Sequence, residues 1–247
     1  MISINTKYCA LSGNALKIIA AITMLVDHIG FILFPGVTIL RILGRISFPI
    51  FAFMIAEGCH YTKNKLRYFL GVFILGAICQ SVLYIQKGDT KMGVLITFSL
   101  SIIIVYALQY MKNVLFAPKK GVFKPIISIC IFLLTTVGVY LLSTYVRIDY
   151  GFFGCMAPAF ASIFKKPSSA TSTLWNKLDT NILNTVMLGI CIIIIGCIYG
   201  RTQPYALLAI PFLLLYSGKR GRLKMKYFFY LFYPIHLVVL EGIRLLF

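Results

Sequence analysis

The chain has 247 residues, of which 60% are hydrophobic and only 12% are charged. This composition excludes an ordinary soluble domain, which needs a more strongly charged surface. The net charge of +18 is one that nucleic-acid binding proteins share, but short cytoplasmic loops of multi-span membrane proteins also accumulate Lys and Arg. We therefore expect a membrane protein with the lipid bilayer as its surroundings and with no nucleic-acid partner.

Apolar blocks of roughly 15 to 24 residues recur along the chain, which predicts an all-α integral membrane protein. The nine predicted spans are Asn14–Phe34, Thr38–Gly58, Leu66–Gln86, Met92–Lys112, Val122–Tyr145, Tyr150–Phe164, Asn181–Tyr199, Gln203–Ser217 and Tyr227–Phe247. The sixth and eighth are short and contain proline, as broken helices that line cavities often do. We expect one polytopic domain over residues 1–247, a single helical bundle with a central cavity, with eight or ten spans as alternatives.

The distribution of basic residues decides the orientation. Nine spans place 17 of the 24 Lys and Arg on the side of the N-terminus and the other 7 on the opposite side. Removal of the sixth span would leave the two sides nearly balanced. The positive-inside rule therefore favours nine spans in the cytoplasmic (inner) membrane, with the N-terminus in the cytoplasm and the C-terminus outside.

Neither the cysteines nor the loops predict a second domain. The seven cysteines are scattered and have no CxxC spacing, so neither a disulfide framework nor a metal site is indicated. The stretch 165–180 is rich in Ser and Thr and is the one linker-like segment.

The first span carries an adjacent acid and imidazole, Asp27 and His28, in an apolar run. Ionisable groups at this depth are costly and are functional by default. Lys17 lies eleven residues before His28, close to three helical turns, so both project from one face about 16 Å apart. This spacing suits a long substrate with an anionic head and a reactive tip. The alternative is a lysine that reaches lipid phosphate and a histidine bonded to a nearby carbonyl.

The second span carries two arginines, Arg41 and Arg45, on one helical face. Arg45 is expected at the depth of Asp27 in the antiparallel first helix, so an Asp27–Arg45 ion pair is predicted, in either a structural or a catalytic role. Pro49 is expected to kink this helix. Glu57 lies near the cytoplasmic end and is able to reach water.

The last span contains His236, two residues after Pro234 and within a cluster of Tyr and Phe. The cluster is partly an interfacial aromatic belt, and a packing histidine is the alternative to a functional one. No HExxH, GxSxG, phosphate-loop or dinucleotide pattern is present, so metallohydrolase and nucleotide-hydrolysis functions have no motif.

Several of these residues also form a pattern that resembles the TraX family of conjugal-transfer membrane proteins. The pattern covers nearly the whole chain in the same order. It comprises Asn14 to Lys17, Asp27-His28, Gly44 to Phe53, Glu57-Gly58, Thr97-Phe98, Asp149-Tyr150-Gly151, Tyr216 to Gly221 and Phe229 to Leu237.

The resemblance implies a membrane-embedded acetyltransferase, because the best-known family member acetylates the N-terminus of pilin subunits. Acetyl-CoA, a coenzyme A thioester, would be the co-substrate and a peptide amine the acceptor. The first helix also resembles that of the wider transmembrane acyltransferases, which carry a basic residue ten positions ahead of a histidine. This second resemblance implies that Lys17 contributes to coenzyme A binding and that His28 is the catalytic base. A mechanism built on these resemblances has further candidate residues. They are Lys63, Arg67 and Lys219 for the phosphates, Asp149, Tyr150 and Tyr233 for the substrate, and Asp27, Arg45, Glu57 and His236 around the base.

Roles within that site stay open at this point. Asp27 or Glu57 is a candidate to orient the imidazole, Arg45 to stabilise an oxyanion, and His236 to replace His28 as the base. Adjacent helical residues point about 100° apart, so a direct Asp27–His28 bond is not expected and a third partner is. O-acylation of an envelope glycan is an alternative reaction, and a non-enzymatic transporter or secretion-associated protein is the alternative class.

Overall fold

The computed structural model describes residues 10–87, 90–118, 121–222 and 225–246. All the named elements in these ranges are helices, as the composition predicts. They are α1 (Gly13–Ile32), α2 (Thr38–Gly44), α3 (Ser47–Tyr61), α4 (Lys65–Lys87), α5 (Val94–Leu115), α6 (Phe123–Tyr145), α7 (Gly151–Phe160), α8 (Thr173–Leu178), α9 (Asn181–Tyr199), the 3-10 helix η2 (Gln203–Ala209), α10 (Ile210–Leu214) and α11 (Lys226–Arg244).

Six helical segments of the described chain are long and apolar enough to cross a membrane. They are Gly13–Ile32, Thr38–Tyr61, Lys65–Val82, Val94–Leu115, Phe123–Tyr145 and Asn181–Tyr199. These segments indicate a multi-pass membrane protein, and they match six of the predicted spans as apolar helices at the expected positions. The sixth, eighth and ninth predicted spans correspond to α7, to η2 with α10, and to α11, which are outside this set. Nine spans and a central cavity therefore stay predictions.

The predicted second span is broken rather than continuous. Helix α2 ends at Gly44 and α3 begins at Ser47. Between them the Arg45 N–H donates to the Ile42 carbonyl at 3.2 Å, a tighter turn than the α-helix makes. Pro49 lies in the first turn of α3, where its missing N–H costs no helical bond. The predicted kink is present, as a break just before the proline.

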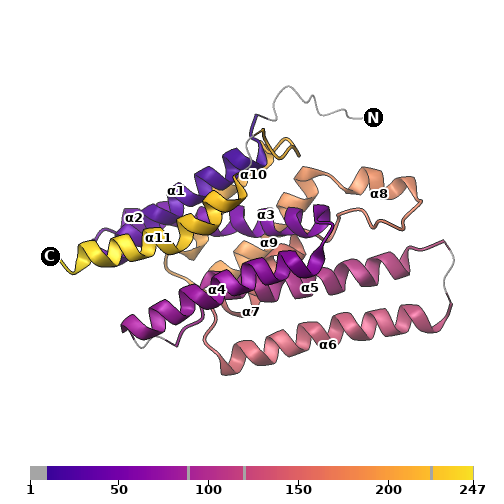
Figure 1. The fold of residues 1–247 in the computed structure, drawn as a ribbon. Coiled ribbons are helices and arrows are strands. Elements are labelled where there is room, and N and C mark those ends of the chain that lie inside the picture. The colour runs from indigo at the N-terminus through magenta and orange to yellow at the C-terminus, as the bar shows by residue number, and fades with distance from the viewer. Residues whose placement is uncertain (1–9, 88–89, 119–120, 223–224, 247) are drawn as a thin grey trace. The chain divides into compact units, whose positions relative to one another are not determined.

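The chain divides into two compact units, and the first comprises Met1–Met54 with Ile192–Phe247. In this unit α1 packs against α2 and α11 (Figure 1). Helix α2 also contacts η2. Glycines line the contact between α1 and α2. A Cβ built on Gly30 would lie 2.7 Å from the Leu40 Cβ, and one on Gly44 would lie 2.6 Å from the Asp27 Cα. Small residues at such positions let helix backbones approach closely.

The start of α1 is held by a loop from the other end of the chain. Leu11 forms an isolated parallel bridge with Tyr216. The Gly13 N–H donates to the Lys219 carbonyl at 2.8 Å. The Ser12 hydroxyl accepts the Ala15 N–H at 3.2 Å. These bonds satisfy N–H groups that a helix start leaves without partners, so the loop and α1 are fixed together.

The second unit comprises Ile55–Cys191. Within it α5 packs against α4, α6 and α7 (Figure 1). Helix α8 lies in the stretch predicted to be a linker. Its Trp175 is buried and lies edge-on to Phe116, with ring centroids 4.8 Å apart. The buried Trp175 ring therefore packs this Ser- and Thr-rich segment against the end of α5. The composition of the segment did not predict this contact.

Candidate active site

Helix α1 presents its two adjacent polar residues to different neighbours. Asp27 faces α2, where it contacts Arg41 and Arg45, and His28 faces His236 of α11. Neighbouring helical side chains diverge by about 100°, so this division follows from the helix itself. The expectation that Asp27 does not bond His28 directly, and that His28 has a third partner, fits this geometry.

Asp27 binds two arginines. Its Oδ2 accepts from Arg41 Nη1 at 2.6 Å, and its Oδ1 accepts from Arg45 Nη2 at 2.6 Å. The side chain of Arg45 is 7% exposed and that of Asp27 14%, so the pair is well shielded from solvent. The structure contains the predicted Asp27–Arg45 pair. It adds Arg41, whose position one helical turn before Arg45 is the sequence signal for a shared partner.

The two intramembrane histidines contact each other. His28 Nδ1 lies 3.0 Å from His236 Nε2, and the ring centroids are 4.9 Å apart. His236 Nδ1 lies 2.8 Å from the carbonyl oxygen of Phe232. A carbonyl only accepts, so His236 Nδ1 carries a proton and donates it. In a neutral His236, Nε2 is then an acceptor, and His28 Nδ1 is its donor. His28 therefore presents the lone pair on Nε2, the form that a general base needs.

Aromatic rings hold His236 in place. The Phe232 ring stacks on it with centroids 5.0 Å apart, and the Tyr233 ring meets it edge-on at 5.5 Å. Both residues were in the sequence pattern, but only Tyr233 was predicted to have a site role. Its ring contacts His236 of the histidine pair, and its role in substrate binding stays a prediction.

The predicted phosphate-binding residues Lys17 and Lys219 belong to the same unit as the histidine pair. Lys17 Nζ lies 5.9 Å from the ring centroid of Phe229 in α11. Lys17 and His28 thus both face α11, as their spacing on one helical face predicts. Lys219 is exposed, and its carbonyl accepts the Gly13 N–H.

Glu57 lies in the second unit and is buried. Its carboxylate forms an ion pair with Lys165, whose Nζ also lies 3.6 Å from Asp179 Oδ1. Burial lowers the pKa of Lys165, but the Glu57 and Asp179 carboxylates outweigh this effect and raise the pKa above its ordinary value. The expectation that Glu57 simply reaches water was wrong, since a buried carboxylate needs a partner. Its role in orienting His28 stays a prediction.

The remaining predicted residues also lie in the second unit. Lys63 and Arg67 are exposed around the start of α4. Asp149 pairs with Lys91 at 2.5 Å, and its carbonyl accepts the Thr97 hydroxyl at 3.0 Å. Tyr150 precedes α7 with a φ of 59°, a left-handed conformation that is uncommon for a residue other than glycine. Roles for these residues in phosphate or substrate binding stay predictions.

The chain matches the family described as TraX protein over residues 12–244. It is 43% identical over 67 residues to an uncharacterized protein of Rickettsia prowazekii, a match that covers 27% of this chain and 25% of that protein. It is 24% identical over 251 residues to a probable fimbrial assembly protein, FimC of serogroup H1, from Dichelobacter nodosus, with 95% of this chain and 96% of that protein covered. No solved structure matches the chain. Because the family match extends over nearly the whole sequence, the chain belongs to the TraX family.

Proposed function

We propose that the protein is a membrane-embedded acetyltransferase. It moves an acetyl group from cytoplasmic acetyl-CoA to the N-terminal amine of an exported or membrane peptide. The observation that carries this proposal is the histidine pair, in which His236 keeps the proton of His28 on Nδ1 and leaves Nε2 of His28 as a base. Membership of the TraX family and the likeness to a fimbrial assembly protein favour a peptide over a glycan acceptor.

The chemical step needs a base and a balanced proton path. The acceptor amine attacks the acetyl carbonyl of the thioester while His28 Nε2 takes its proton. The resulting tetrahedral centre collapses, the C–S bond breaks, and the thiolate of coenzyme A takes a proton back from the His28 imidazolium. His236 Nε2 holds the Nδ1–H of His28 during both transfers, so it stabilises the transient positive charge.

The cations of the first unit have different roles in this proposal. Arg41 and Arg45 both bind Asp27, which neutralises one of their two charges and fixes their positions. This geometry favours a structural role for Arg45 over the oxyanion role that the sequence left open. Lys17 and Lys219 are the cations proposed to hold the coenzyme A phosphates, with Lys63 and Arg67 as further candidates.

We also propose the finer arrangement in the membrane. Helices α7, η2 with α10, and α11 complete nine spans around a central cavity. The N-terminus lies in the cytoplasm and the C-terminus outside, in the cytoplasmic (inner) membrane. The excess of Lys and Arg on the N-terminal side supports this orientation.

The experiment supplies purified full-length protein in detergent with acetyl-labelled acetyl-CoA and a panel of acceptors. The panel holds a short peptide with a free N-terminus, the same peptide with a blocked N-terminus, and a sugar. We expect label on the free peptide alone, together with release of coenzyme A. Label on the sugar alone would support O-acylation instead. Absence of both coenzyme A release and acetyl-CoA binding with every acceptor would contradict the enzyme proposal.

A further inference from the structure

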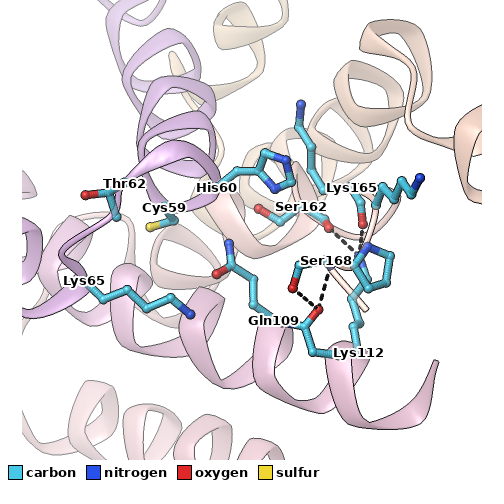
Figure 2. A pocket seen from close by; sticks show the side chains of 12 residues that line it. Cys59, His60, Thr62, Lys65, Gln109, Lys112, Ser162, Lys165 and Ser168 are labelled. Atoms are coloured by element: carbon cyan, nitrogen blue, oxygen red, sulfur yellow. Dashed lines mark hydrogen bonds between the residues drawn. The ribbon is translucent and has the colours of Figure 1, made fainter. Parts of the chain in front are cut away.

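A lysine-rich pocket lies in the second unit, and no role has been assigned to it so far. It is lined by 12 residues from the end of α3, the start of α4, the end of α5 and the segment before α8, and its volume is about 130 Å³ (Figure 2). Four of these residues are lysines, and none is acidic. Such a lining attracts an anion.

Two of the four lysines build the pocket wall. Lys112 Nζ donates to the carbonyls of Ser162 at 3.1 Å and Ile163 at 2.7 Å, and it lies 4.8 Å from the ring centroid of Trp175. Lys165 is held by Glu57 and Asp179. The N–H groups of these two ammonium groups already donate to protein partners. The two lysines therefore shape the pocket and are poorly placed to bind a ligand.

Of the other two lysines, Lys65 is exposed and Lys166 is half-buried, and both have weaker attachments. Lys65 Nζ lies 5.0 Å from the Tyr106 ring centroid. Lys166 Nζ donates to the Asn176 side chain at 2.8 Å in an exposed bond. An exposed bond of this kind exchanges readily with a ligand, because its net stabilisation is small. Both ammonium groups are therefore available to an anion.

The pocket lining also contains uncharged hydrogen-bond donors, the side-chain amides of Gln109 and Asn113. Gln109 is half-buried in α5, and its side-chain amide makes no hydrogen bond within the described residues (Figure 2). Asn113 uses its Oδ1 to accept the Ser168 N–H at 2.9 Å and the Ser168 hydroxyl at 3.1 Å, which leaves its Nδ2 as a donor. Two carboxamide donors beside the ammonium groups of Lys65 and Lys166 match the acceptor-rich surface of a phosphate.

We infer that this pocket binds the phosphate groups of an anionic ligand through Lys65, Lys166, Gln109 and Asn113. Its volume of about 130 Å³ is below the range of about 300–1,000 Å³ that whole drug-sized ligands occupy, so it takes one or two phosphate groups and leaves the rest of the ligand outside. The phosphates come from a soluble nucleotide-like molecule or from a lipid headgroup. This inference does not depend on acetyl transfer.

The test measures binding of inorganic pyrophosphate to the full-length protein in an uncharged detergent by calorimetry. The variant Lys65→Gln/Lys166→Gln removes one exposed and one half-buried positive charge from the pocket. The matched control Lys124→Gln/Lys177→Gln removes two exposed charges from elsewhere in the same unit. We expect the pocket variant to weaken binding about tenfold or more, through loss of charge-assisted bonds, and the control variant to leave it nearly unchanged. Gln109→Leu, which changes no charge, should also weaken it.

Two competition arms identify the source of the phosphates. Displacement of pyrophosphate by coenzyme A supports a soluble ligand, and displacement by short-chain phosphatidylglycerol, but not by phosphatidylcholine, supports a lipid. The pocket variant should keep its weakened pyrophosphate binding when Lys17→Gln/Lys219→Gln is added, which separates this pocket from the cations proposed to hold coenzyme A in the reaction. No pyrophosphate binding to the wild type, or equal weakening in the pocket and control variants, would overturn the inference.

Discussion

At the scale of single residues, the proposed chemistry depends on which nitrogen of His28 holds a proton. That proton is fixed by a chain of acceptors that begins at the Phe232 carbonyl and passes through His236. His236 is thus a positioning residue, and His28 is the proposed base. Replacement of His28 and replacement of His236 should therefore lower kcat to different extents.

Replacement of His236 by Phe should keep the ring stacking and remove the acceptor for His28 Nδ1–H. We expect kcat to fall by about 10²-fold, with the KM for acetyl-CoA unchanged, because the lysines proposed to bind the phosphates are intact. His236→Gln should recover part of the rate, since its carboxamide oxygen accepts a hydrogen bond. A steady-state comparison checks this. A larger loss in His236→Phe than in His28→Ala would make His236 the base.

The Asp27 cluster should be a determinant of stability. Asp27→Asn leaves the shielded guanidinium of Arg45 and the partly exposed one of Arg41 without their carboxylate, and we expect a loss of about 3 kcal/mol in the free energy of unfolding. Asp149→Asn is the matched control, because its partner Lys91 has a side chain that is 51% exposed. That change should cost at most about 1 kcal/mol. Unfolding of both variants in the same detergent gives the comparison, and equal stability of Asp27→Asn and the wild type would refute this role.

The sequence was enough to predict the Asp27–Arg45 pair, but not the contact between His28 and His236. Helical spacing and antiparallel depth were enough to predict the Asp27–Arg45 pair. The contact of His28 with His236 joins residues 208 positions apart, and no periodicity specifies which distant helices meet. The same limit applies to Glu57 and Lys165, which come from different elements of the second unit.

At the scale of elements, the contact between α1 and α2 depends on glycine. A Cβ on Gly44 would lie 2.2 Å from the Asp27 Cβ. Because the same Cβ would lie 2.6 Å from the Asp27 Cα, a backbone atom, the two helices would have to separate to admit an alanine. That separation would also pull Arg45 away from its carboxylate.

Gly44→Ala should therefore lower the thermal midpoint of the purified protein. Gly138→Ala in α6 is the control, because a Cβ there meets nothing within 4 Å. Alanine is the better helix former by about 1 kcal/mol, so the control should be neutral or slightly stabilising. A thermal melt followed by intrinsic fluorescence distinguishes them, and a Gly44→Ala midpoint at or above that of the wild type would contradict the close approach.

The long helices could largely be predicted from the sequence. The break between α2 and α3 could be predicted only in part, and the short helix α8 could not. Long apolar runs gave α1, α4, α5, α6 and α9 with ends a few residues from the observed ones. The break before α3 was indicated by Pro49, but its form depends on the Arg45 and Ile46 turn. Helix α8 was missed, because six residues in a Ser- and Thr-rich stretch carry no periodic signal and their order comes from packing of Trp175.

At the scale of the whole molecule, the described chain forms two compact units, and the predicted site residues divide between them. The histidine pair, the Asp27 cluster, Lys17 and Lys219 lie in one, and Glu57, Lys63, Arg67 and Asp149 lie in the other. The single-domain expectation for residues 1–247 stays a prediction.

The proposed orientation has a direct test in reporter fusions. A fluorescent protein that matures only in the cytoplasm should be bright when fused before Met1 and dark when fused after Phe247. A phosphatase that is active only outside should give the opposite pattern. A bright C-terminal fusion would mean an even number of spans, which would remove one short segment from the proposed nine.

The most direct test of the proposed base is the rate of acetyl transfer to a free peptide amine by purified wild type and His28→Ala, with thermal melts to verify that both are folded. The account predicts transfer by the wild type and a loss of at least about 10²-fold in kcat for His28→Ala at an unchanged thermal midpoint. Equal rates in the two folded proteins would contradict it.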